Sequence, residues 1–184
     1  MSSDGAVLDA NVLVPAPLRD ILLRAAEAAL YRPFWSDALL EEVRRTVIRH
    51  GMADLERARR LIDRLTAAFP EAGVQGYEHL VPVMTNDPKD RHVLATAVLA
   101  QASVIVTANV RHFSEAALAP WGVVARTPDR FLVDLFGVDP TRMVRIIHEQ
   151  AAPLRHPPLT ADQLLTNIAV HAPHFARQVR PELD

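Results

Sequence analysis

The sequence contains no cysteine. This absence excludes disulfide bonds, thiolate metal sites and cysteine nucleophiles. No apolar run approaches the roughly 18 to 20 residues that a membrane-spanning helix needs, and the opening residues lack the basic and then apolar pattern of a signal peptide. We therefore expect a cytoplasmic protein with no membrane partner.

The chain also lacks an excess of positive charge, since its formal net charge is −2. Domains that bind polyanions usually present a strongly basic surface, so any RNA contact has to come from local patches. Lys89 is the single lysine among 20 basic residues, and the others are arginine. Arginine suits forked recognition of phosphate, although a GC-rich genome explains the bias equally well. None of the six glycines forms a phosphate-binding loop, which excludes P-loop and dinucleotide folds.

Short β-branched runs alternate with longer helical stretches over the first three quarters of the 184 residues. Expected strands lie at residues 6–8, 33–35, 80–83 and 103–107, with a weaker edge candidate at 122–125. Expected helices cover residues 17–30, 37–50, 55–65 and 128–136, and a further one starts at Pro88 with Asp87 as its N-cap. This alternation predicts an α/β fold of three layers, α/β/α, in which helices cover both faces of a central parallel sheet. We assign residues 1–137 to this domain.

Residues 138–184 show helical patterns only, and we assign them to a helical C-terminal extension. One helix is expected at residues 141–152, followed by a break at Pro153 and at residues 157–158. The next helix starts at Thr160, where Thr160 and Gln163 can form a capping box. The extension is too small to bury much of its own core, so we expect it to pack on the main domain or on a partner.

Two acids far apart in the sequence are expected at one edge of the sheet. Asp9 follows the strand at 6–8, and ligands of parallel sheets bind beyond the carboxyl ends of the strands. Glu42 lies nearer than Glu41 to the apolar stripe of its helix, whereas Glu41 faces outward and pairs with Arg45. The structural alternative for Asp9 is a turn aspartate that bonds its own backbone.

Asp90 is the third candidate acid, because it begins the inward stripe of the helix after Pro88. As a third helical residue Asp90 could also interact favourably with the positive end of the helix dipole. Capping of the helix alone suffices to explain Asp87. Gathered carboxylates repel one another and normally coexist only around a divalent cation. Asp9, Glu42 and Asp90 therefore indicate an enzyme that uses Mg²⁺ or Mn²⁺ and acts on phosphates.

Polar residues near these acids are candidates for supporting roles. Asn11 can orient Asp9 or hold a metal-bound water, and Thr107 and Asn109 end the strand at 103–107 beside Asp9. Strand-end turn chemistry explains Thr107 and Asn109 equally well. The candidates for RNA contact are Arg45, Arg49, Arg111 and His112. The alternative for the two helical arginines is a plain solvated face.

At these residues the sequence resembles the PIN-domain nucleases, and in particular the VapC-type toxins of bacterial toxin–antitoxin pairs. The matching pieces are Val-Leu-Asp-Ala-Asn at residues 7–11, the segment 36–43 with the second acid, Asp-Arg-His-Val-Leu-Ala at 90–95, and Val-Thr-Ala-Asn at 106–109. No single piece is specific to this family, but the four pieces together match its order and spacing.

The resemblance implies a divalent-metal site that hydrolyses RNA phosphodiester bonds. Asp9, Glu42 and Asp90 would hold Mg²⁺ or Mn²⁺, with Asn11, Thr107 and Asn109 in support. It also implies an antitoxin that covers the site, and a homodimer. Many relatives carry a fourth acid where Asn109 or His112 stands, and this chain has neither. The extension 138–184 lies outside the common motifs.

Two other functions compete with this one. A catalytically degenerate domain that binds RNA or a protein partner is favoured by the missing fourth acid and opposed by the three acids that remain. A small-molecule phosphatase with Asp9 as nucleophile is the weaker alternative, because enzymes of the haloacid-dehalogenase type need an aspartate where Asn11 stands.

Overall fold

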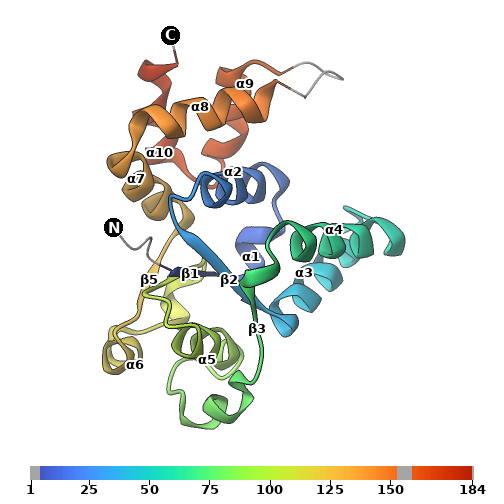
Figure 1. Cartoon of the computed structure of the whole chain (residues 1–184), viewed down its shortest axis with the longest axis vertical. Coiled ribbons are helices and arrows are strands. Elements are labelled where there is room, and N and C mark those ends of the chain that lie inside the picture. Colours follow the sequence, from blue (N-terminus) through green and yellow to red (C-terminus); the bar gives the residue numbers. More distant parts are fainter. Residues whose placement is uncertain (1–4, 153–158, 184) are drawn as a thin grey trace.

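A parallel sheet forms the centre of the computed structural model, which describes residues 5–152 and 159–183 (Figure 1). Its five strands are ordered β3-β2-β1-β4-β5, and every neighbouring pair is parallel. They are β1 (Gly5–Leu8), β2 (Arg32–Ser36), β3 (Gly73–Val74), β4 (Val104–Val106) and β5 (Val124–Arg126). The predicted α/β class is confirmed, and the weak candidate at 122–125 corresponds to the edge strand β5.

Helices cover both faces of this sheet, as the three-layer prediction requires. In Figure 1 α5 lies on one side of the sheet and α2 on the other. α5 packs on β1, β2 and β4, whereas α2 and α3 pack on β2. The helices of this part are α1 (Ala10–Leu13), α2 (Ala16–Glu27), α3 (Asp37–Arg49), α4 (Leu55–Ala68), α5 (Arg91–Leu99) and α6 (Glu115–Leu118).

The prediction of a strand at residues 80–83 is wrong. These residues belong to a 3₁₀ helix, Tyr77–Val83, that packs against α5. Pro82 lies inside this segment and has no N–H to donate to a strand ladder. Val83 is also exposed, which a strand inside the sheet would not allow. The third strand is instead β3, a two-residue strand that pairs with the end of β2.

The predicted helix start at Asp87 and Pro88 is also wrong. Helix α5 begins at Arg91, and Asp90 occupies the N-cap position without a capping hydrogen bond from its side chain. Asp87 accepts a hydrogen bond from the Lys89 backbone instead, at 3.0 Å. The helix therefore begins three residues later than predicted. Asp90 directly precedes its first residue and is not its third residue.

In the described part of the chain, the helices that follow the sheet are α7 (Pro128–Val138), α8 (Pro140–Ala151), α9 (Ala161–Ala169) and α10 (Pro173–Val179). α8 and α9 pack on α2, and α7 packs on α8 and α10, at the top of Figure 1. The predicted capping box of Thr160 and Gln163 is present. The break at Pro153 and residues 157–158 lies outside the described residues, and α10 was not predicted.

The C-terminal helices share one continuous apolar cluster with the sheet. Of the two expected locations for the extension, the structure therefore shows the main domain. The boundary after residue 137 stays a prediction, and α7, which precedes it, packs on the helices that follow it. Among the described residues, no helix combines the length and the apolar character needed to cross a membrane.

Candidate active site

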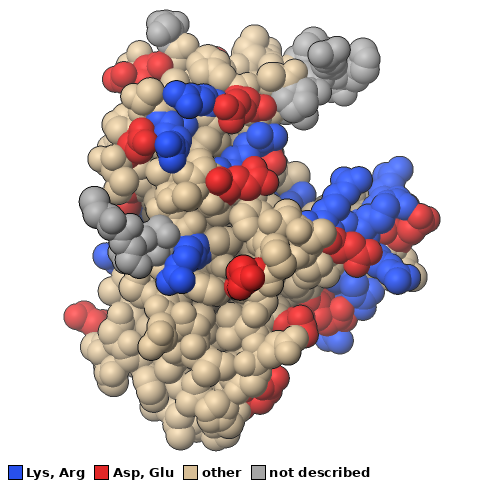
Figure 2. Space-filling model, viewed as in Figure 1, with Lys and Arg blue, Asp and Glu red and all other residues tan. Residues whose placement is uncertain are grey.

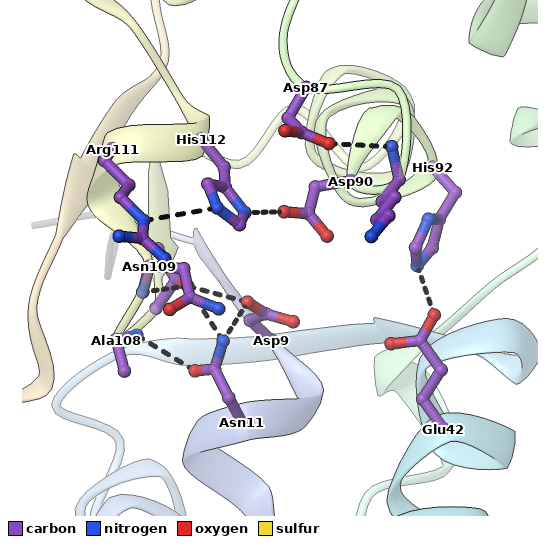
Figure 3. A network of polar contacts seen from close by, with 12 residues as sticks. Asp9, Asn11, Glu42, Asp87, Asp90, His92, Ala108, Asn109, Arg111 and His112 are labelled. Atoms are coloured by element: carbon purple, nitrogen blue, oxygen red, sulfur yellow. Dashed lines mark hydrogen bonds and ion pairs between the residues drawn. The ribbon is translucent and has the colours of Figure 1, made fainter.

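Asp9 and Thr107 meet at the carboxyl edge of the sheet. They directly follow β1 and β4, which are neighbours with Leu8 opposite Val106. The Thr107 hydroxyl donates to Asp9 Oδ2 at 2.6 Å (Figure 3). Asn11 Nδ2 donates to the same oxygen at 2.5 Å. The structure thus brings Asn11 and Thr107 to Asp9, as the sequence predicted.

Asn11 also ties the two strand ends together. Its Nδ2 lies 3.1 Å from Thr107 Oγ1, and its Oδ1 accepts from the Ala108 backbone at 2.9 Å. Asn109 contributes a backbone N–H to Thr107 Oγ1 at 3.0 Å. These bonds fix the position of the Asp9 carboxylate, while a role for the Asn109 side chain stays a prediction.

The environment of Asp9 opposes its negative charge. Only 4% of Asp9 is exposed. Burial raises the pKa of Asp9 and outweighs the hydrogen bond from Thr107, which lowers it. The nearby charges of Asp90 and Glu42 raise the pKa of Asp9 further. A carboxylate in such a place is stabilised as an anion by a cation, and the donor set therefore fits a metal ion.

Glu42 faces the acids, whereas Glu41 does not. Glu41 Oε2 lies 2.6 Å from Arg44, and Glu41 Oε1 lies 2.7 Å from Arg45. The hydrogen bonds from Arg44 and then Arg45 lower the pKa of Glu41 to about 2. Glu42 Oε1 instead lies 3.2 Å from His92 Nε2. The choice of Glu42 over Glu41 therefore agrees with the geometry, although its role as a ligand stays a prediction.

His92 is a site residue that the sequence analysis missed. Its Nε2 contacts Glu42 without hydrogen-bonding geometry, so the contact is chiefly electrostatic. Burial disfavours the charged ring, but Glu42, Asp9 and Asp90 outweigh it and raise the pKa of His92. Its place two residues after Asp90 was the available signal, since both lie at the start of one helix.

Asp90 lies closest to His112. The Asp90 Oδ2 atom is 2.6 Å from His112 Nδ1. One ligand atom each of Asp87, Asp90 and His112 lies within 4.8 Å of the others, and no other such group of three occurs among residues 5–152 and 159–183. Asp9 interacts through charge with both Asp90 and Glu42, and neither Asp9 nor Glu42 belongs to this tight group.

The predicted arginine contacts are only partly brought to the acids. Arg111 Nε lies 3.4 Å from His112 Nε2. Arg45 is bound to Glu41 on the outer face of α3, and Arg49 is exposed at the end of that helix. Figure 2 shows blue and red residues interleaved over α3 and α4, in agreement with the many arginine–carboxylate pairs there. A role of these arginines in RNA binding stays a prediction.

Comparison with known families and proteins gives two matching regions. A family model described as "PIN domain" matches residues 5–111, and one described as "VapC50 C-terminal domain" matches residues 128–181. A Mycobacterium tuberculosis protein named "Putative ribonuclease VapC50" is 39% identical over 116 residues. The alignment covers 63% of this chain and 66% of that protein, so the chain spans just under two thirds of its relative.

Proposed function

Because this chain belongs to the PIN-domain family, we propose that it is a metal-dependent endoribonuclease and the toxin of a type II toxin–antitoxin pair. The observation that carries this proposal is the buried Asp9 carboxylate, which Asn11 and Thr107 hold at the sheet edge beside Asp90 and Glu42. The similarity to the protein named "Putative ribonuclease VapC50" also supports it. The cytoplasm, where cellular RNA is exposed, is the proposed location.

Asp9, Glu42 and Asp90 would hold Mg²⁺ or Mn²⁺. Their oxygen donors suit either ion. When bound, such an ion lowers the pKa of a coordinated water and neutralises charge that develops on the scissile phosphate. The protein's own side chains would bind and orient the acids and the RNA.

Three residues position the acids. Asn11 and Thr107 both donate to Asp9 Oδ2, which fixes the rotation of this carboxylate before RNA arrives. His92, at the start of α5, lies against the Glu42 carboxylate and would hold it on the side of the acids. Groups that hold metal ligands in this way typically contribute 10- to 100-fold to metal affinity or activity, as an order of magnitude.

RNA and a cognate antitoxin are the proposed partners, and a homodimer is the proposed assembly. Arg111 is the arginine that contacts the site, through His112, and we assign to it the contact with an RNA phosphate. An antitoxin would block cleavage by covering the same acids, since a cationic side chain placed there compensates their repulsion.

Metal dependence is the first test. We expect purified protein, freed of antitoxin, to cleave tRNA or rRNA with Mg²⁺ or Mn²⁺ and to stop when EDTA is added. Activity should return when excess metal is restored, and the products should carry 5′-phosphate and 3′-hydroxyl ends, as hydrolysis by a metal-activated water requires. Cleavage that continues in EDTA, or products with 2′,3′-cyclic phosphates, would contradict the proposal.

The competing function is a degenerate domain that binds RNA without cutting it. The specific observation in its favour is the missing fourth acid, since Asn109 and His112 stand at the two positions where the resemblance places it. Metal binding with no cleavage of tRNA or rRNA by a folded, antitoxin-free protein would support this function instead.

Glu42 and Glu41 provide a matched pair of variants. We expect Glu42→Gln to lower the cleavage rate by at least about 10-fold, because it removes a charge that would hold the metal. Glu41→Gln should leave the rate unchanged, since it disturbs only the pairs with Arg44 and Arg45, which lie away from the acids. Initial rates on one RNA, measured over a range of metal concentrations, check this prediction. Equal effects of the two variants would remove Glu42 from the site.

A further inference from the structure

Asp87, Asp90 and His112 form a compact set of three ligating side chains. They come from two segments far apart in the sequence, the turn before α5 and the 3₁₀ turn Val110–His112 after β4. Their ligand atoms lie within 4.8 Å of one another. In Figure 3 the imidazole of His112 points at the Asp90 carboxylate, with Asp87 on the adjoining turn.

Backbone hydrogen bonds hold this set in place. The Asp87 N–H donates to the His112 carbonyl at 3.1 Å, and the Asp90 N–H donates to the Asp87 carbonyl at 2.9 Å. The side chains of His112 and Asp90 remain 25% and 19% exposed. The set is therefore fixed by the main chain and still open to an ion from solvent.

The donor chemistry of this set is mixed. Two carboxylates supply hard oxygen donors, and His112 supplies an imidazole nitrogen. Mg²⁺ favours oxygen donors, whereas imidazole suits transition metals. Asn86, next to Asp87 in the sequence, is 4% exposed, and neither atom of its side-chain amide has a partner among the described residues. A bound water or ion is one explanation for such an unpaired amide.

We propose that Asp87, Asp90 and His112 form a cation site that selects Mn²⁺ over Mg²⁺ through the imidazole of His112. Its use in RNA cleavage rests on the proposed nuclease function, whereas ion binding at the site does not. The ion would share Asp90 with the site at Asp9 and Glu42, which links the two places.

Pulsed EPR with Mn²⁺ tests the proposal directly. The full-length chain, without any histidine tag, receives less than one equivalent of MnCl₂, and the spin-echo modulation from a coordinated ¹⁴N nucleus is recorded. We expect this modulation in the wild type and its loss in His112→Ala. His174→Ala is the matched control, because His174 Nδ1 also lies 2.6 Å from an aspartate, Asp129, away from the site. His92→Gln controls for the other histidine near the acids.

Calorimetric titration with MnCl₂ and MgCl₂ provides the second measurement. We expect the wild type to bind Mn²⁺ at least about 10-fold more tightly than Mg²⁺. Removing a group that only supports a metal ligand already costs about 10- to 100-fold in affinity, and the His112 nitrogen would itself be a ligand of Mn²⁺. His112→Ala should remove this preference, and His112→Asp should shift it toward Mg²⁺ by restoring an all-oxygen set. Melting temperatures of the metal-free variants check that each is folded.

Several outcomes would overturn the proposal. One is the absence of nitrogen modulation in the wild type. Another is modulation that disappears in His92→Gln and persists in His112→Ala. Equal affinities for Mn²⁺ and Mg²⁺ would do the same, and would leave His112 as a hydrogen-bonding brace for Asp90. These measurements contain no RNA, so failure of nuclease activity and failure of this site are recorded separately.

Discussion

Asp9→Asn is expected to lose metal-dependent RNA cleavage by at least about 10²- to 10³-fold, the usual cost of removing one preorganised electrostatic group from an active site. The asparagine keeps the size of the side chain. Its carbonyl oxygen can still accept the hydrogen bonds that Asn11 and Thr107 now donate to Asp9 Oδ2. What the substitution removes is the buried negative charge that would face the metal.

The same variant should be at least as stable as the wild type in EDTA. Burial and the charges of Asp90 and Glu42 raise the pKa of Asp9, so the folded state binds its proton more tightly than the unfolded state does. Stability from this group is therefore present at low pH and is lost as pH rises. The neutral amide of Asp9→Asn avoids this cost near neutral pH, and the melting temperature of the variant without metal should equal or exceed that of the wild type.

Single-turnover cleavage and thermal melting of one protein preparation check both parts. Asp63→Asn is a suitable control, since it makes the same chemical change on the exposed face of α4, where the Asp63 side chain is 69% exposed. It should alter neither quantity. Full metal-dependent activity of Asp9→Asn would exclude Asp9 from the reaction, and a large fall in its melting temperature would make the loss of activity a folding effect.

The parts of the fold that the sequence predicted are those with strong periodicity. β1 and β4 are apolar, buried and central, and the residues that follow them had to meet once the strands were neighbours. For this reason Asp9, Asn11 and Thr107 could be grouped from the sequence. The helical pattern of α3 favoured Glu42 over Glu41, and the structure has Glu42 beside His92 but leaves its side chain more exposed than that of Glu41, 47% against 35%, so its role stays a prediction.

The parts that the sequence did not predict depend on contacts between distant segments. The apolar run at 80–83 resembles a strand locally, but its packing on α5 as a 3₁₀ helix is a tertiary effect. Asp87 looked like a helix cap, and only the pairing of its backbone with His112 reveals a candidate ligand set. The contact of His92 with Glu42 likewise joins two helices that no periodicity links.

Phe175→Ala should lower the free energy of unfolding by about 3–5 kcal/mol, the typical cost of emptying a buried phenylalanine site. Phe175 in α10 is fully buried and packs edge-on against Phe136 of α7 at 6.3 Å between ring centres. Since α7 to α10 and the sheet share one apolar cluster, the wild type should unfold in a single transition in urea, and the variant should shift all of it. Val170→Ala, at a side chain 76% exposed, is the control and should change stability by less than about 0.5 kcal/mol.

If only an early, separate transition moves in Phe175→Ala, the C-terminal helices form an independent unit. Retention of RNA cleavage after that transition would place the catalytic unit in the PIN domain alone.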